Sequence, residues 1–523
     1  MMKETKIHLL ITSDIHGYVY PTLYRDKTEE PMGLAKIATI VQQRRRAGQV
    51  LLIDNGDLIQ GSPLTYFHSK FHSEIDNPII QVANYLSYDA AIFGNHEFNF
   101  GLKILSNVVE QSQFPWLGAN IVHQDSAEPY FGKPYIIKEI EGIRLAILGV
   151  TTHFVPLWEE AAHIEGLRFE DALQSTEYWC NHIHQKEKVD VLIVAYHGGF
   201  ERHLETGEIT EQDTGENQGY AICEKIPSID VLITGHQHRL LADKLNGVSI
   251  IQPGTQGQAL GEIILSISHN PSGKVVRVEH ESKLITIDES VPANMATLEA
   301  IATIQEETEQ WLDQRIGEIQ GDMQIVNAFQ TRLADHPYVE FINKLQMKVT
   351  GAMISNTALF NNEANGFSNS VTMRDIVSNY IYPNTLKVLQ LTGQDIKDAL
   401  EQCATYFIEN NGEIIVNPIF AEPKAQHYNY DMWEGIEYEL KISNPIGARV
   451  TKLLYEDSPI DMDRQFSVVM NSYRASGAGN FEMFKGRPIL KEIQTDMTEL
   501  IANELLEMKE ITATCNNNWR VVL

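Results

Sequence analysis

Short apolar runs alternate with amphipathic segments through the first half of the chain. The runs predict strands at 7–12, 50–54, 90–93, 145–150, 189–195, 231–234 and 248–252. Apolar positions at helical spacing predict helices at 34–47, 102–112, 169–186 and 217–226. Strands interleaved with helices favour an α/β sandwich in which helices cover the sheets.

The second half mixes the two element types less regularly. It has predicted helices at 336–350, 373–381 and 393–407 and predicted strands at 387–392, 436–442 and 466–471, which indicates an α+β domain. A polar, acidic stretch at 297–313 with few breakers separates the halves and is interpreted as a connecting helix. Because 523 residues exceed one core, we expect a first domain at 1–290, a linker helix at 291–315 and a second domain at 316–523.

The net charge of the chain limits the classes of partner that it can bind. The chain has 70 Asp and Glu against 41 Lys and Arg, a net charge of -29. Such a surface repels polymeric nucleic acid and anionic membranes, so neither is expected as a partner. Small phosphorylated substrates remain compatible with it, because a metal cluster reverses the field locally.

The N-terminus and the cysteines bear on location. The start, MMKETKIHLLITSD, lacks the apolar stretch and cleavage site of a secretory signal, and no window reaches eighteen apolar residues. Cys180, Cys223, Cys403 and Cys515 are scattered without a CxxC pair, as is typical of reduced thiols. We therefore expect a cytoplasmic protein.

Five predicted strands are followed by loops that carry His, Asp or Asn. These loops contain Asp14 and His16, Asp57, Asn95 and His96, His197, and His236 and His238. Each motif alone is weak, because a single loop His is usually a surface or capping residue and Gly-Asn pairs usually mark turns. Open α/β sheets bind ligands at the carboxyl ends of their strands, so five such loops together indicate one site.

The side chains in these loops suit two divalent cations. Imidazole, carboxylate and amide without thiolate favour Mn, Zn, Fe or Ni over a sulfur-bound zinc site or an all-oxygen calcium site. Two metals about 3.5–4 Å apart need a shared ligand, and a carboxylate can bridge them. A hydroxide held between the metals would be a nucleophile at neutral pH, with phosphate oxygens neutralised by the same ions.

The five loops resemble those of the calcineurin-like metallophosphoesterases, whose run is D-x-H, G-D, G-N-H-E, H and G-H-x-H in this order. DNGDLIQGSPL, GNHEFNFGL and NSYRASGAG extend the resemblance to the two-domain 5'-nucleotidase family. Within this family, the segments most resemble those of the bacterial 2',3'-cyclic-nucleotide 2'-phosphodiesterase/3'-nucleotidases. The resemblance implies a four-layer α/β/β/α sandwich followed by a smaller α+β 5'-nucleotidase C-terminal domain.

The resemblance also implies a role for each loop residue. Asp14, His16 and His238 would hold one metal and Asn95, His197 and His236 the other, with Asp57 bridging. His96 would act on the leaving group and the phosphate. Many relatives have Asp three residues after this His, whereas this chain has Asn99. An amide orients an imidazole but stabilises an imidazolium less than a carboxylate does, which leaves open whether His96 is a general acid or a charge-stabilising donor.

The second domain shows no obvious metal ligands. The resemblance implies that it holds the nucleobase between two aromatic rings, and Tyr382 and Tyr473 lie in the matching segments, with Tyr430 or Trp433 as alternatives. Arg474 would bind phosphate or ribose, or form an ordinary salt bridge. Asn480 would bind the base, or serve only the Gly-rich turn in which it lies.

The expected function is metal-dependent hydrolysis of nucleotide phosphoesters, of the 2',3'-cyclic-nucleotide phosphodiesterase/3'-nucleotidase type, by a monomer or weak dimer. One alternative is a 5'-nucleotidase or nucleotide-sugar diphosphatase. Another, of a different class, is a catalytically silent nucleotide-binding protein. The complete set of ligand residues argues against the silent alternative, which Asn99 alone favours.

Overall fold

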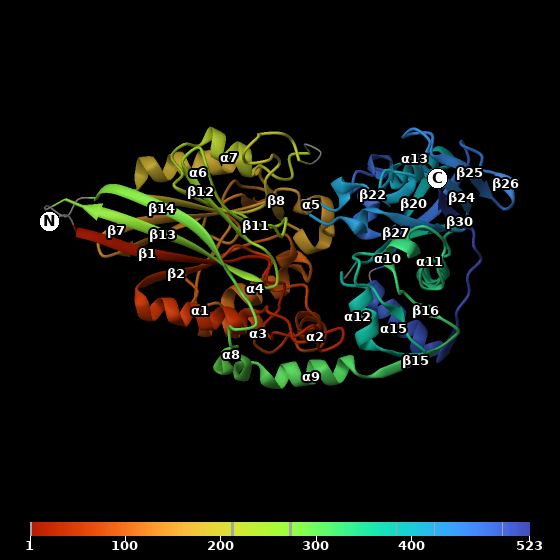
Figure 1. Cartoon of the computed structure of the whole chain (residues 1–523), viewed down its shortest axis with the longest axis horizontal. Coiled ribbons are helices and arrows are strands. Elements are labelled where there is room, and N and C mark those ends of the chain that lie inside the picture. The colour runs from red at the N-terminus through yellow and green to blue at the C-terminus, as the bar shows by residue number, and fades with distance from the viewer. Residues whose placement is uncertain (1–2, 211–213, 271–274, 383, 423, 494) are drawn as a thin grey trace. The chain divides into compact units, whose positions relative to one another are not determined.

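A computed structural model describes residues 3–210, 214–270, 275–382, 384–422, 424–493 and 495–523. The described chain divides into two compact units, Met1–Thr308 and Glu309–Leu523 (Figure 1). The division falls inside helix α9 (Ala302–Leu312). Within the described residues, no helix has the length and apolar character needed to cross a bilayer.

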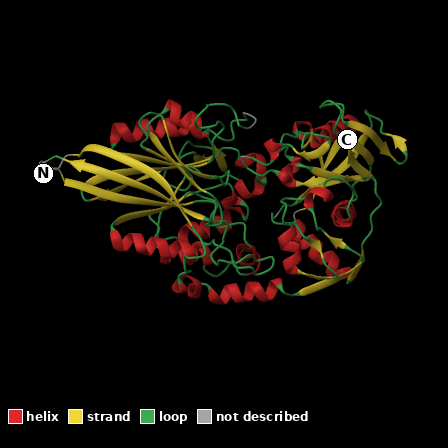
Figure 2. Ribbon diagram, in the orientation of Figure 1, coloured by secondary structure: helices red, strands yellow, loops and turns green. Residues whose placement is uncertain are grey.

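The described residues of the first unit are built around two six-stranded sheets, with a small two-stranded sheet beside them (Figure 2). One sheet has the strand order β14 (Val275–Thr286), β13 (Ala259–His269), β1 (Lys3–Thr12), β2 (Gln49–Asp54), β3 (Ala90–Ile92) and β4 (Trp116–Leu117). The strands from β1 to β4 are parallel, whereas β13 pairs antiparallel with β1 and with β14. The alternation of runs and helices did not predict β13 and β14.

The other large sheet also contains four neighbouring parallel strands. Its strand order is β11 (Leu240–Leu245), β12 (Val248–Pro253), β10 (Val231–Ile233), β9 (Val191–His197), β7 (Ile143–Thr151) and β6 (Tyr135–Ile140). The four central strands are parallel, and an antiparallel strand closes each edge. Parallel strands of both sheets therefore deliver their following loops to one edge of each sheet.

Helices cover the outer faces of the two sheets. In Figure 1, α6 (Ala172–Lys186) and α7 (Gly219–Lys225) lie on one side and α1 (Leu34–Ala47) on the other. A core of aliphatic side chains such as Leu9, Ile53, Ile193 and Ile233 joins the two sheets. These four layers confirm the expected α/β/β/α sandwich. Further helices of this unit are α2 (Pro63–Phe71), α3 (Pro78–Tyr85), α4 (Gly101–Gln111), α5 (Val155–Trp158) and α8 (Met295–Ala300).

Local chemistry corrects two predicted helix boundaries. Helix α6 begins at Ala172 rather than 169, because the Asp171 side chain caps it by accepting from the backbone N–H of Gln174, and Phe169 ends strand β8 (Leu167–Phe169). The expected single connecting helix is two helices, α8 and α9, because the chain leaves helical geometry at Ile301. Short strand β5 (Ile121–His123) pairs with β8.

The second unit is an α+β domain around a mixed sheet. This sheet has the strand order β23 (Asp431–Glu434), β17 (Ile354–Ala358), β27 (Gln465–Asn471), β20 (Leu386–Thr392) and β28 (Ile489–Ile493). A second sheet has the order β26 (Ser458–Pro459), β25 (Val450–Tyr455), β24 (Glu437–Lys441) and β30 (Trp519–Val522). The smaller groupings are β19 (Ser370–Thr372) with β15 (Arg315–Gln320) and β29 (Glu510–Thr512), β16 (Met323–Gln324) with β18 (Gly366–Phe367), and β21 (Phe407–Asn410) with β22 (Glu413–Val416).

The helices of this unit begin at strong caps. Thr372 and Thr392 form reciprocal capping boxes with Asp375 and Asp395 at α12 (Met373–Asn379) and α13 (Gly393–Ala404). Helix α13 stops before the predicted 407 because Phe407 begins β21. The remaining helices are α10 (Ala328–Thr331), α11 (Pro337–Thr350), α14 (Ser472–Ala475) and α15 (Met497–Met508).

Candidate metal centre

The polar loop residues of the first unit come together where parallel strands end. Asp14 and His16 follow β1, Asp57 follows β2, and Asn95 follows β3. His197 is the last residue of β9, and His236 and His238 follow β10 in the other sheet. Both sheets therefore contribute side chains to one cluster, from positions more than two hundred residues apart in the chain.

The backbone of this cluster is unusual. Asp14, His16, Asp57, His236 and His238 all have positive φ, between 51° and 67°. This region is costly for residues with a side chain, and such strain concentrates at functional sites. The neighbouring glycines are required by space, because a Cβ at Gly94 would collide with the Asp57 carboxylate and one at Gly235 with the Ser13 hydroxyl.

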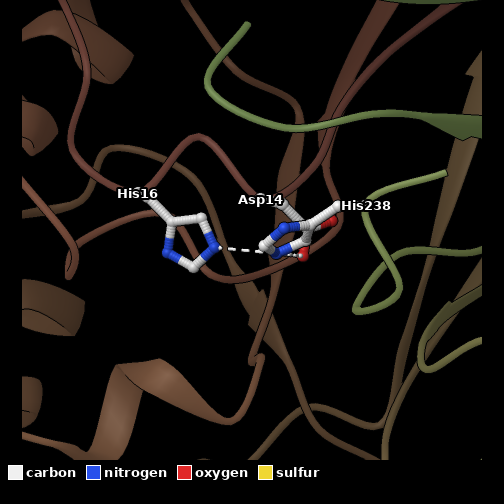
Figure 3. Close-up of side chains that lie close together, drawn as sticks. All are labelled: Asp14, His16 and His238. Carbon is white, nitrogen blue, oxygen red and sulfur yellow. Dashed lines mark hydrogen bonds and ion pairs between the residues drawn. The ribbon is translucent and has the colours of Figure 1, made fainter. Parts of the chain in front are cut away.

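Asp14, His16 and His238 form a first group of donors. Asp14 Oδ1 and His16 Nε2 lie 3.4 Å and 3.1 Å from His238 Nε2, and Figure 3 shows the two imidazoles and the carboxylate facing one another. The Ser13 hydroxyl donates to Asp14 Oδ2 at 2.5 Å. The ligand atoms of the three residues all lie within 4.8 Å of one another, as close as donors to one ion.

Asp57, His197 and His236 form a second group of the same size. Asn95 lies among them, with its Oδ1 2.9 Å from His236 Nδ1 and 3.2 Å from His197 Nε2. Both imidazoles are buried, and Asn95 is 9% exposed. The group therefore offers two ring nitrogens, an amide oxygen and a carboxylate.

Asp57 lies between the two groups. Its Oδ2 is 3.2 Å from His197 Nε2 and 4.0 Å from His16 Nε2, and its Oδ1 accepts from the His96 backbone N–H at 2.8 Å. Burial favours the protonated acid, but the His197 and His96 imidazoles outweigh it and hold the pKa of Asp57 well below its ordinary value. Burial lowers the pKa of His16 to about 4, which favours its neutral form, whereas the Asp57 carboxylate outweighs burial and raises the pKa of His197 to about 10.

Outer partners orient three of the four imidazoles in the two donor groups. His16 Nδ1 donates to the Gln60 carbonyl oxygen at 2.9 Å and His197 Nδ1 to the Asn55 carbonyl oxygen at 2.7 Å. The Glu216 carboxylate accepts a hydrogen bond from His236 Nε2 at 2.8 Å. Each ring thus turns its remaining nitrogen to the cluster, which is the arrangement of metal-binding histidines. The donor set, its spacing and its orientation fit two divalent ions.

His96 stands beside the cluster. Its ring meets the His16 ring edge-on with centroids 5.3 Å apart, and its Nδ1 lies 2.7 Å from Asn99 Oδ1. The adjacent Glu97 is 1% exposed and accepts from the backbone N–H groups of Gly94, Asp57 and Leu58. Glu97 thereby fixes the loop that carries Asp57 against the loop that carries Asn95.

Family models match both halves of the chain. Calcineurin-like phosphoesterase matches residues 7–240, and the 5'-nucleotidase C-terminal domain matches residues 315–486. A solved Staphylococcus aureus chain proposed to be a 5'-nucleotidase is 34% identical, with a TM-score of 0.91 over 99% of this chain and 100% of that one. The chain belongs to the 5'-nucleotidase family of calcineurin-like phosphoesterases. Membership confirms the expected fold and enzyme class, a phosphoester hydrolase, and implies divalent metals.

Curated relatives are more distant. The trifunctional nucleotide phosphoesterase YfkN of Bacillus subtilis is 25% identical over 99% of this chain, which spans only 39% of the relative's length. A 2',3'-cyclic-nucleotide 2'-phosphodiesterase/3'-nucleotidase of Yersinia enterocolitica is 26% identical over 98% of this chain and 88% of its own.

The 5'-nucleotidase C-terminal domain carries the predicted aromatic pair. Strand β20 pairs antiparallel with β27, and the register places Leu386 opposite Asn471, so Tyr382 and Tyr473 flank the same edge of the sheet. Tyr382 meets Phe360 edge-on at 5.5 Å and Tyr473 meets Tyr428 edge-on at 6.2 Å. Both rings are half-buried. Pro383, part of the motif that pointed to Tyr382, lies outside the described residues.

Arg474 and Asn480 have different surroundings. Arg474 is 1% exposed, and its Nε pairs with Asp431 Oδ2 at 2.8 Å while its Nη2 donates to the Tyr428 carbonyl oxygen. This geometry favours the salt-bridge alternative over contact with substrate. Asn480 is exposed with a φ of 69° at the end of the Gly-rich turn. Of the alternatives for the base, Tyr430 and Trp433 are completely buried among protein side chains.

Sequence reasoning missed three carboxylates around the site. Glu97 stood inside the G-N-H-E motif and its adjacency to His96 could have drawn attention to it. Glu216, against His236, and Glu159, against Asn99, lie in loops without a motif. Their positions follow from the tertiary structure alone.

Proposed function

We propose that the chain hydrolyses nucleotide phosphoesters at a centre of two divalent metals. The observation that carries the proposal is the convergence of two donor groups, with Asp57 between them, at the carboxyl ends of parallel strands. Asp14, His16 and His238 would hold one ion and Asn95, His197 and His236 the other, with Asp57 shared. Mn, Zn and Fe all suit such ligands.

When bound, the two ions would supply charge neutralisation for the phosphate and acidify a water molecule for attack. His96 lies beside the cluster, in contact with the His16 ring and with Nδ1 turned to Asn99, and Nε2 is the nitrogen proposed to meet the substrate. We assign it the oxygen of the leaving group or a phosphate oxygen. Tyr382 and Tyr473 would hold the base, because flat aromatic faces stack on any nucleobase.

The names of relatives support the nucleotide class and leave two ester types. Relatives at 23% and 26% identity over nearly the whole chain are named 2',3'-cyclic-nucleotide 2'-phosphodiesterase/3'-nucleotidases. We place this activity first. The Staphylococcus aureus structure, at 34% identity, is proposed to be a 5'-nucleotidase, which makes 5'-nucleotidase activity the second candidate.

A substrate panel with controlled metal content tests the proposal. The chain would be stripped with a chelator, reloaded with Mn, Zn or Fe(II), and assayed on 2',3'-cyclic AMP, 3'-AMP, 5'-AMP and bis-p-nitrophenyl phosphate. We expect about two ions per chain by elemental analysis and turnover that vanishes with the metal. A fully loaded chain that binds AMP yet hydrolyses none of the four esters would instead be a silent nucleotide-binding protein.

A further inference from the structure

The amide of Asn99 lies between His96 and a carboxylate from a distant part of the chain. Asn99 Oδ1 is 2.7 Å from His96 Nδ1, and Asn99 Nδ2 donates to Glu159 Oε2 at 2.6 Å. Sixty residues separate Asn99 from Glu159. A carboxylate from a distant part of the chain therefore stands one amide away from the His96 imidazole.

Glu159 is held firmly at this position. Its side chain is 6% exposed, and its Oε1 accepts from the Glu160 backbone N–H at 2.9 Å and lies 2.8 Å from His163 Nδ1. Glu159 follows α5, whose last residue, Trp158, stacks on the His236 ring with centroids 5.3 Å apart and planes 17° from parallel. The same short segment thus packs on a proposed metal ligand and reaches the partner of His96.

The polarity of these hydrogen bonds runs in one direction. A carboxylate only accepts, so Asn99 must turn its NH₂ group toward Glu159 and its carbonyl oxygen toward His96. The carbonyl oxygen in turn accepts only an N–H, which places a proton on His96 Nδ1. His96 Nε2 is then the nitrogen that exchanges a proton with substrate.

We propose that Glu159 is a positioning residue for His96, acting through the Asn99 amide. The proposal rests on the proposed phosphoesterase function. When a water oxygen bonds to phosphorus, the bond from phosphorus to the leaving oxygen breaks, and that oxygen takes the proton of His96 Nε2. The attacking water gives up a proton to solvent in the same turnover, and the ring regains one from solvent. Glu159 keeps the ring oriented for this transfer. Without it the Asn99 amide can turn over and present an NH₂ group to His96 Nδ1.

Leaving groups of different basicity separate this role from a general structural one. The sugar oxygen of a nucleotide leaves as a strongly basic alkoxide and needs a proton, whereas nitrophenolate leaves readily without one. A positioning residue for the proton donor therefore matters for nucleotides and little for nitrophenyl esters. Damage to the fold or to the metal ions would slow both substrates alike.

The first experiment is Glu159→Gln in the metal-loaded chain. We expect kcat on the preferred nucleotide to fall about 10-fold, part of the roughly 10²–10⁴-fold that a positioned proton donor supplies. The rate on bis-p-nitrophenyl phosphate should change less than about 2-fold, with KM and metal content retained. Glu165→Gln, an exposed glutamate of the same segment, is the matched control.

The second experiment exchanges the two groups. Asn99→Asp alone replaces the 2.6 Å hydrogen bond from Asn99 to Glu159 with two carboxylates that face each other. This variant should have lower nucleotide turnover. Asn99→Asp with Glu159→Gln restores one acceptor against His96 and one amide behind it. We expect the double variant to recover most of the activity lost in either single variant, a coupling that independent structural damage would not produce.

The outcomes are distinct. Unchanged nucleotide turnover in Glu159→Gln, an equal loss on both substrates, or additive losses in the double variant would each overturn the positioning role. If Glu159→Gln fails to fold, the double variant carries the test alone. A parent chain that hydrolyses none of these esters when loaded with metal would instead refute the proposed function.

Discussion

The two units differ in how clearly the sequence indicates their proposed functional residues. In the first unit, the proposed ligands are His, Asp and Asn side chains at the carboxyl ends of five strands. These strand ends lie together, so the side chains form one cluster. In the second unit, the proposed base-binding rings are tyrosines among 20 in the chain, beside others that only pack. Metal ligation restricts residue type and position together, whereas stacking on a base asks only for a flat ring. Metal ligands can therefore be predicted from a sequence more readily than the residues of an aromatic pocket.

Asp57→Asn should have the largest effect, because this residue lies between both donor groups. An amide has no negative charge to share between two cations, so we expect the variant to lose metal and its turnover to fall to background on every phosphoester. Elemental analysis and a nitrophenyl diester assay measure the two losses. Asp243→Asn, the same change at an exposed site on β11, should retain both. An active Asp57→Asn chain with two ions would remove Asp57 from the centre.

His96→Ala comes next and separates chemistry from metal binding. His96 contacts the cluster through its backbone and ring edge, so we expect the metals to remain. Nucleotide turnover should fall roughly 10²–10⁴-fold, the range for a positioned proton donor. His184→Ala on exposed α6 surface is the control. Loss of an ion from His96→Ala in elemental analysis would reassign the residue as a ligand.

The α/β/β/α sandwich and the loops with the proposed metal ligands could be predicted from the sequence for a physical reason. Buried parallel strands appear as apolar runs, and α1 has the bounds that its spacing predicted. Strand β14 was not predicted because none of its residues is buried and it lacks a continuous apolar run. Strand β13 is mostly buried and was overlooked although it contains the short apolar run 263–265. The break between α8 and α9 at Ile301 was not predicted, because a polar amphipathic stretch has the same pattern whether it forms one helix or two.

The partners behind the site could not be predicted. Asn99 was visible as a departure from Asp, but nothing near it in the sequence points to Glu159, which the fold brings from sixty residues away. Arg474 shows the converse. Its place beside Tyr473 in a family motif left a substrate contact and an ordinary salt bridge open, and the structure places the Asp431 carboxylate against it in the interior.

Arg474→Met tests this interpretation through stability. Both side chains of the pair are 1% exposed, so removal of the cation leaves a buried carboxylate without its partner. We expect a cost of about 3–5 kcal/mol in the free energy of unfolding. Adding Asp431→Asn removes the stranded charge and should restore part of the loss in chemical denaturation. If Arg474→Met is as stable as the parent and instead raises KM for nucleotides, Arg474 binds substrate.

The smallest effect is expected at the aromatic pair, and it decides the substrate class. A ring stacked on a base contributes about 1–3 kcal/mol, so Tyr382→Ala and Tyr473→Ala should each raise KM for nucleotides by roughly 5–150-fold. Turnover of bis-p-nitrophenyl phosphate should stay near the parent rate, because that ester has no base to stack. Tyr178→Ala, at a ring that is 62% exposed on α6, controls for loss of a tyrosine as such. If both variants bind and cleave nucleotides like the parent, the rings only pack against Phe360 and Tyr428. The case for a nucleotide substrate would then rest on the relatives alone, and only the first unit would have a site that the sequence indicated.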